Sequence, residues 1–193
     1  MRVRAALLCC LFLTPSPGAR ADEITDQINE ATAAYQKKDL ATALAALDAA
    51  ANLLRQARGD LFKTALPRPL PGWAAEDAEV NVAAAAVMGG GITASRKYQK
   101  GDDQITVELM ADGPIVASMA ALLSSPVLAM GGARQVVIGG RRMAYMKDDN
   151  AYLSMVADRV LVKISANRGV PDEALRAYVA ATDFAAIDKL ARQ

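Results

Sequence analysis

The sequence predicts an α+β protein, with an N-terminal helical hairpin followed by an antiparallel sheet of about six strands and helices on one face of that sheet. Three observations support this prediction. Early in the chain, apolar residues recur at helical spacing. The later part alternates short strand patterns with turn residues. Between the two parts, residues 67–72 carry three prolines at alternate positions, which exclude a helix there.

The first 21 residues have the pattern of a secretory signal peptide. Arg2 and Arg4 precede a run of nine apolar residues, and Ala19 and Ala21 supply the small residues of a signal peptidase site. A nine-residue helix spans about 14 Å, against about 30 Å for the hydrocarbon core of a membrane. We therefore expect a periplasmic or secreted protein, cleaved near Ala21/Asp22, without a stable membrane span in the mature chain. An uncleaved anchor is the alternative.

Both cysteines, Cys9 and Cys10, lie inside this segment, and the chain has no histidine. A mature chain would therefore have no disulfide, no cysteine nucleophile and no imidazole base, and we expect no cofactor and no metal site. The segment also holds three of the 22 basic residues and none of the 21 acidic ones, which leaves the mature chain with a net charge of −2. No basic block remains, which argues against nucleic-acid binding.

Residues 22–66 predict the helical hairpin. The first helix covers about 23–37 and the second about 40–66, with Asp39 as the cap of the second. We expect one apolar stripe per helix, and we expect Gly59 to end or bend the second helix. The stripes are Ile24, Ile28, Ala31 and Tyr35 in the first helix, and Leu40, Ala43, Leu44, Leu47, Ala50, Leu54 and Leu61 in the second.

The turn of this hairpin resembles a tetratricopeptide-type helix–turn–helix. The likeness rests on Ala31, the run YQKKDL at 35–40, and the small residues Ala43 and Ala50 in the second helix. It covers about 30 residues. There is no second copy, and Arg55 stands where the closing proline is usual, whereas arrays of such repeats need three or more units. A plain amphipathic hairpin packed on its own domain is the alternative interpretation.

Residues 73–193 predict the α+β domain. Residues 115–123 carry no charge and predict a buried helix, and the last helix is expected to begin at Pro171. The stretch 74–88 has no clear pattern. The expected strands are 92–99, 104–110, 134–138, 141–147, 151–157 and 159–166. The inner stripe of the last helix is Leu175, Tyr178, Val179 and Thr182, continued by Phe184, Ile187 and Leu190.

The run GITASRKYQKGD at 91–102, the apolar helix with its proline, and the closing order of strand, proline and helix are similar to exported bacterial domains with PsbP-like sheets. This resemblance covers about 120 residues. It implies a fold and no catalytic residues.

Three groups of residues are compatible with chemistry, but each has a structural interpretation. The glycines at 89–91 lack the Gly-Lys-Ser/Thr of a phosphate loop, which favours a flexible joint. Ser95 and Lys97 would share one strand face, which allows a serine–lysine dyad but is typical of a solvated face. The acidic turns at 102–103 and 148–150 offer oxygen ligands for calcium without the full calcium-loop pattern, which favours tight turns.

The acidic cluster of Glu76, Asp77 and Glu79 lies near Trp73. Paired carboxylates can hydrolyse glycosides or peptides, and a tryptophan can stack on a sugar. A charged, solvated helix start beside a core tryptophan explains the same residues. A hydrolase that uses carboxylates alone is therefore the third function hypothesis.

The most apolar stretch of the mature chain is 115–130. It predicts a core helix or a surface for a hydrophobic partner, and the methionines nearby in sequence supply adaptable apolar groups. Our first function hypothesis is a non-enzymatic binding or adaptor protein. The second is a carrier of a small apolar ligand, held between the sheet and the 115–130 helix. The candidate surface comprises Ile115, Met119, Leu122, Leu123, Met143 and Met155.

Overall fold

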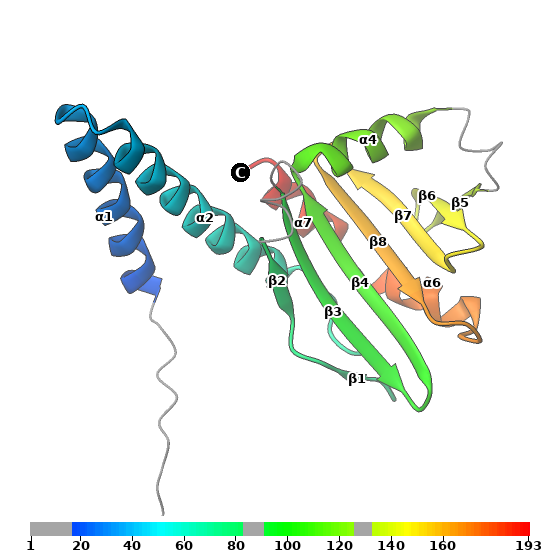
Figure 1. The fold of residues 1–193 in the computed structure, drawn as a ribbon. Helices are drawn as coiled ribbons and strands as arrows, with labels where there is room; N and C mark the ends of the chain where they lie inside the picture. The colour runs from blue at the N-terminus through cyan, green and yellow to red at the C-terminus, as the bar shows by residue number, and fades with distance from the viewer. Residues whose placement is uncertain (1–16, 83–90, 126–132) are drawn as a thin grey trace, which may run out of the picture. The chain divides into compact units, whose positions relative to one another are not determined.

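The structure is a computed structural model that describes residues 17–82, 91–125 and 133–193 (Figure 1). The chain divides into two compact units, residues 1–53 and 54–193. The described residues contain five helices and an eight-stranded antiparallel sheet, which confirms the α+β prediction. The predictions for Cys9, Cys10, Gly89 and Gly90, most of the proposed signal peptide and residues 126–130 lie outside the described residues.

The first unit contains a helical hairpin, as predicted. It consists of α1 (Pro17–Gln36) and the first part of α2 (Leu40–Thr64). The chain reverses at Lys38, which has a φ of 62°. Asp39 caps α2 because its carboxylate accepts hydrogen bonds from the backbone N of Thr42 at 3.1 Å and from the Thr42 hydroxyl at 2.8 Å.

The two helices of the hairpin meet through alanine rather than leucine. The large apolar residues of α2 in this unit, Leu40, Leu44 and Leu47, are more than half exposed. The residues of the predicted stripe lie toward one side of α2, as their spacing requires, but the alanines on that side are buried whereas these leucines are exposed. The buried seam comprises Ala31, Ala34, Ala43, Ala46 and Ala50.

The second unit is built on the sheet, whose strand order is β1-β3-β4-β8-β7-β6-β5, with β2 also paired to β3. The two short strands β1 (Ala74–Ala75) and β2 (Glu79–Asn81) arise in the stretch that had no clear pattern. The six expected strands are all present. They are β3 (Ile92–Lys100), β4 (Asp103–Ala111), β5 (Ala133–Ile138), β6 (Arg141–Met146), β7 (Ala151–Val156) and β8 (Val160–Ala166).

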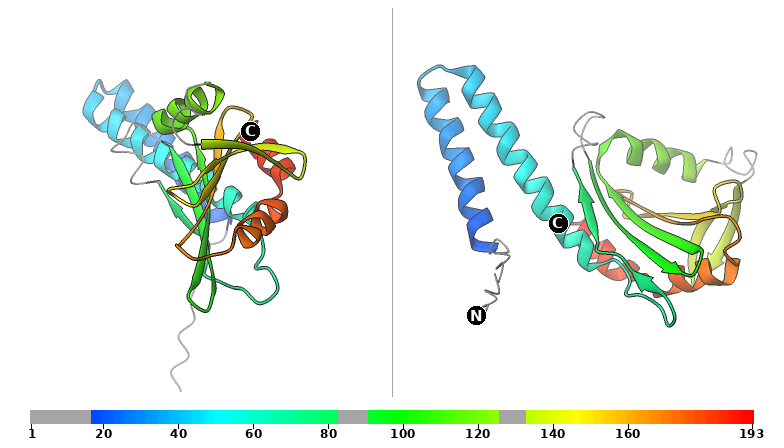
Figure 2. Two further views of the ribbon diagram at one scale, coloured as in Figure 1. Left: turned by 90° about the vertical axis from the view of Figure 1, so that its right-hand side faces the viewer. Right: turned by 60° about the horizontal axis from the view of Figure 1, so that its bottom comes forward.

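Helices lie on both faces of the sheet (Figures 1 and 2). The main core forms on the face covered by α6 (Asp172–Ala181) and α7 (Phe184–Ala191), and it includes Phe62 from the end of α2. A second core lies on the opposite face, beneath α4 (Gly113–Ser124). The expectation of helices on one face therefore holds for α6 and α7 only. Strand β8 supplies both cores because its successive side chains point to opposite faces.

Two helices depart from their predicted form. In α4 only Val116 is fully buried, whereas Ile115 is 47% exposed and Leu122 is 39% exposed, so the expected buried helix covers the sheet with one side only. In α2 the helix continues past Gly59 to Thr64, so this glycine neither ends nor interrupts it. Within the described ranges, no helix is both long and apolar enough to cross a membrane.

The proline-rich segment after α2 packs against the main core. The hydroxyl of Tyr98, a fully buried side chain, donates to the Pro67 carbonyl at 2.6 Å, and Arg96 Nη1 donates to the same oxygen at 3.4 Å. The backbone N of Leu70 donates to the Tyr178 hydroxyl at 3.4 Å. These contacts satisfy backbone groups that prolines leave without a regular partner.

Candidate functional site

The sheet opens between β6 and β7. Among the described strands, these two pair over three residues only, from Ala144 opposite Leu153 to Met146 opposite Ala151. Their neighbours stay paired along the full strands, with six residue pairs between β5 and β6 and six between β7 and β8. The early part of β6 and the late part of β7 therefore diverge. One side-chain hydrogen bond spans the gap, from Ser154 Oγ to the Arg142 carbonyl at 3.3 Å.

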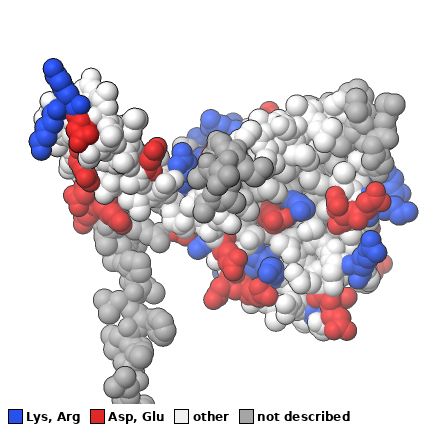
Figure 3. Space-filling view, in the orientation of Figure 1, with Lys and Arg blue, Asp and Glu red and all other residues white. Residues whose placement is uncertain are grey.

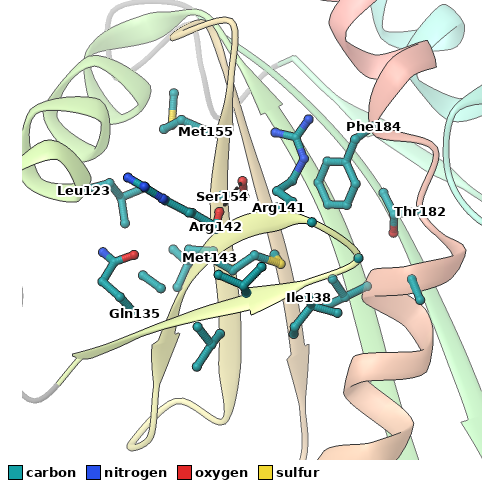
Figure 4. Close-up of a pocket in the computed structure, with 18 of the residues that line it drawn as sticks. Leu123, Gln135, Ile138, Arg141, Arg142, Met143, Ser154, Met155, Thr182 and Phe184 are labelled. Atoms are coloured by element: carbon teal, nitrogen blue, oxygen red, sulfur yellow. Dashed lines mark hydrogen bonds between the residues drawn. The ribbon is translucent and has the colours of Figure 1, made fainter.

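This divergence forms an open pocket of about 1040 Å³ inside the second unit. Its walls are the β5–β6 hairpin, β7, the C-terminal end of α4, and the segment that joins α6 to α7 (Figure 4). Apolar side chains from both sheet faces contribute, including Leu123, Ile138, Met143, Met155 and Phe184. The pocket exists because β6 carries its hairpin partner away from the rest of the sheet.

Two neighbouring arginines enter the pocket from opposite faces of β6, as alternation along a strand requires. Arg141 lies over the Phe184 ring, with its guanidinium carbon 4.3 Å from the ring centroid. Figure 4 shows the Arg142 side chain extended toward Leu123, below Met155. The Arg142 guanidinium forms no hydrogen bond or ion pair with any residue that the structure describes.

The acidic residues near the pocket have other roles. Asp183 caps α7, where its carboxylate accepts from the backbone N of Ala186 at 2.9 Å. A hydrogen bond from Arg192 lowers the pKa of Asp188, outweighing the opposing effect of burial, and the positive charges of Arg192 and Arg141 lower it further. Asp158 is exposed at the turn between β7 and β8. Arg142 is therefore the charged group of the pocket best placed to meet a ligand.

The described residues that line the pocket include no nucleophile paired with a base. Its two buried hydroxyls are engaged by main-chain carbonyls, Ser154 as above and Thr182 through a 2.8 Å hydrogen bond to Tyr178. The chain has no histidine to act as their base. No group of three or more acidic, cysteine or histidine residues among the described ones is placed to hold a metal ion.

The structure brings three of the six residues of the candidate surface together in this pocket. Leu123, Met143 and Met155 line it. Met119 instead packs into the core beneath α4, and Ile115 and Leu122 are exposed on α4 outside the lining. The assignment of these six residues to a ligand or partner surface stays a prediction.

The other chemical candidates have structural partners. Glu76 forms an ion pair with Lys97 at 3.9 Å, and its side chain accepts a hydrogen bond from Gln99 at 3.1 Å. Lys97 is thus engaged by a carboxylate rather than by Ser95. Trp73 meets the Tyr178 ring edge-on, with 5.5 Å between ring centroids, so it packs on the core rather than beside the acidic cluster as a platform for a sugar.

One residue in each of the two acidic turns makes a structural hydrogen bond. The side chain of Asn150, at the end of the β6–β7 turn, accepts from the Tyr145 hydroxyl at 3.3 Å. The Asp102 carbonyl accepts from the Asn167 side chain at 2.8 Å, which ties the β3–β4 turn to the residue that follows β8.

Sequence reasoning missed Arg141, Arg142 and Phe184 as pocket residues. The pair of adjacent arginines at the start of a strand was visible, but the divergence of β6 from β7 has no sequence signature. No protein family, curated protein or solved structure matched the chain.

Proposed function

We propose that this protein is an exported, non-enzymatic binding protein that carries a small, largely apolar ligand with one anionic group. The observation that carries this proposal is the pocket opened between β6 and β7, into which Arg142 extends without a described partner. Small-molecule sites are concave and combine apolar walls with a few placed polar groups. The pocket has the size of the larger ones, and about half of its exposed lining is polar, which suits an amphipathic ligand.

The chemistry of the lining supports an amphipathic anion. Methionine, leucine and phenylalanine side chains suit a flexible hydrocarbon body. Arg142 supplies a planar, permanently charged guanidinium that pairs with a carboxylate or phosphate. The engaged hydroxyls and the lack of histidine favour binding over catalysis.

The test compares dodecanoate with dodecanol, which share one hydrocarbon chain and differ in the anionic head. Calorimetric titration of the wild type should show tighter binding of dodecanoate. Replacing Arg142 by glutamine should weaken dodecanoate binding about tenfold and leave dodecanol binding within about twofold, because one charge-assisted contact is lost. Arg168→Gln is the matched control, since it removes the same charge from an exposed loop outside the pocket.

A second variant tests the pocket itself. Ala180 lines it from an exposed position on α6, so Ala180→Trp should narrow the pocket at little cost in stability and weaken the binding of both probes. If dodecanoate did not bind the wild type at concentrations up to about 1 mM, the proposal would be refuted. Equal losses in R142Q and R168Q would refute the role of Arg142.

Export is a separate part of the proposal. It is supported by the N-terminal sequence pattern alone. After expression of the full chain in a Gram-negative host, the periplasmic fraction should contain a protein whose intact mass begins at Asp22. An intact mass that still includes residues 1–21, found in the cytoplasm, would contradict export.

An adaptor role is the second candidate function, and the exposed Ile115 and Leu122 of α4 favour it. Chemical cross-linking in a host extract should then give a product with another protein that is lost when Ile115 and Leu122 are both changed to glutamate. A product that is equally abundant with this variant would contradict an adaptor role of α4.

A further inference from the structure

The hairpin of the first unit exposes an unusual amount of apolar side chain. Five large residues contribute, two from α1 and three from α2. Isolated exposed apolar residues are normal on a protein surface, whereas a contiguous group marks an interaction site. Their exposed fractions are 45% for Ile28, 68% for Tyr35, 58% for Leu40, 63% for Leu44 and 52% for Leu47.

These residues share one face of the hairpin. Tyr35 directly follows the buried Ala34, and Leu44 and Leu47 directly follow the buried Ala43 and Ala46. One residue turns a helix by about 100°, so each exposed side chain lies about a quarter-turn beyond the alanine seam. Because the two helices are antiparallel, a rotation in the chain direction away from the seam brings the side chains of both helices to the same side of the hairpin. The exposed residues of α1 and α2 therefore form one surface, which we name the leucine face.

The spacing along α2 indicates that another helix covers the leucine face. Leucines 40, 47, 54 and 61 recur every seventh residue, and each is about half exposed. With Leu44 and Ala51, apolar residues alternate at spacings of four and three from Leu40 to Leu54. This alternation is the pattern of helices that pack side by side with knobs into holes. Leu54 and Leu61 lie in the part of α2 that belongs to the second unit.

We infer that the leucine face binds a second copy of this chain, so that two hairpins form a four-helix bundle. A hairpin closed by alanines alone buries only small side chains between its helices. Two such hairpins related by a twofold axis place identical apolar faces against each other and enclose the leucines in a shared core. This inference concerns the hairpin and does not depend on the proposed ligand site.

The area of the leucine face suits a stable dimer. A large apolar side chain has a surface on the order of 200 Å², so the five residues expose roughly 600 Å² per copy. Specific protein interfaces bury about 1,200–2,000 Å² in total, and two copies of the leucine face would contribute about 1,200 Å².

A membrane surface suits the hairpin less well. Helices that lie on membranes carry lysine and arginine on their polar side. The polar side of α1 is acidic, with four exposed carboxylates turned away from the leucine face, and Figure 3 shows acidic residues along this helix. These residues are Asp22, Glu23, Asp26 and Glu30.

Light scattering after size exclusion, applied to the full chain, tests the inference. The wild type should elute with twice the 20.3 kDa chain mass at micromolar concentrations. Leu44→Glu combined with Leu47→Glu should shift the dissociation constant by at least about 100-fold toward the monomer, because it buries charge at the centre of the interface. Ala45→Glu is the matched control: it adds the same charge at an exposed neighbouring position that points away from the leucine face, and it should remain dimeric.

Far-UV circular dichroism separates dissociation from unfolding. The double glutamate variant should keep its helical signal as a monomer. If it unfolds, Leu44→Ala combined with Leu47→Ala should still weaken the dimer about tenfold with an unchanged signal. A wild type that stays monomeric up to about 200 µM would overturn the inference. Equal dimerisation of the wild type and the double glutamate variant would also overturn it. If the wild type is monomeric and co-floats with anionic vesicles in a density gradient, the leucine face binds lipid instead.

Discussion

Replacing Gly59 by alanine should destabilise the second unit, although alanine is the better helix former. In an exposed helix the change would gain about 1 kcal/mol. At Gly59 a Cβ atom would lie 2.4 Å from Val80 Cγ1, and 3.1 Å from both Val80 Cγ2 and Ile92 Cγ2. Both neighbours are β-branched and have little freedom at χ1.

The two effects set the expected magnitude. Overpacking of this kind costs about 1–3 kcal/mol. After the gain in helix propensity, we expect a net loss of about 1 kcal/mol in the free energy of unfolding. Changing Val80 to alanine removes both of its close methyl groups, so Gly59→Ala should become neutral or stabilising in that background. The double-mutant cycle should therefore give a coupling of about 2 kcal/mol between the two positions.

Urea unfolding provides the assay. Trp73 is the only tryptophan of the chain and packs edge-on against Tyr178, so its fluorescence reports on the second unit. The four proteins of the cycle are compared at equal concentration, with Val80→Ala alone as the control for lost packing. An increase of about 1 kcal/mol for Gly59→Ala in the wild-type background would refute the reasoning, because it would show that the glycine meets no neighbour.

Three further predictions use the same unfolding assay. Tyr98→Phe removes the buried hydroxyl that donates to Pro67 and should cost about 1–2 kcal/mol, whereas no loss would mean that water replaces this donor. Burial raises the pKa of Tyr98 to about 12, and burial together with a hydrogen bond to a carboxylate raises the pKa of Tyr152 to about 12. Because an unfolded tyrosine titrates near pH 10, their contribution to stability is present below about pH 10 and is lost as pH rises toward 12. The urea midpoint should fall across that window and fall less in the double phenylalanine variant; a midpoint that is flat from pH 9 to 11.5 would contradict these shifts. Phe62→Ala should cost about 3–5 kcal/mol because Phe62 is fully buried, whereas Val137→Ala, at a residue 66% exposed, should cost less than about 1 kcal/mol.

The elements with a strong local pattern could be predicted from the sequence. Val160, Val162 and Ile164 recur at every second position, and all three are buried on the main-core face of β8. Leu175 and Tyr178 follow the helical period and are buried in α6. In both cases the residues that share the period face the main core, so the period of the sequence and the burial in the structure coincide.

The candidate site could not be predicted in the same way. The polar spacing around Arg141 and Arg142 is that of an ordinary strand, and nothing local indicates that β6 is unpaired with β7 before Ala144. Register between strands depends on pairing partners far apart in the sequence. That helices cover both faces of the sheet could not be predicted either, because the sequence of a strand such as β8 does not show which elements pack on each face.

The amino-acid sequence by itself determined the order of the elements, the turns between them and the residue types available for chemistry, because these depend on neighbours along the chain and on composition. Tertiary structure alone decided which apolar residues are buried. In the hairpin the alanines are buried and the leucines are exposed, and the gap between β6 and β7 forms a pocket from residues of otherwise ordinary strands. The burial in the hairpin and the gap in the sheet both depend on how two elements pack, and side chains from both elements determine that packing.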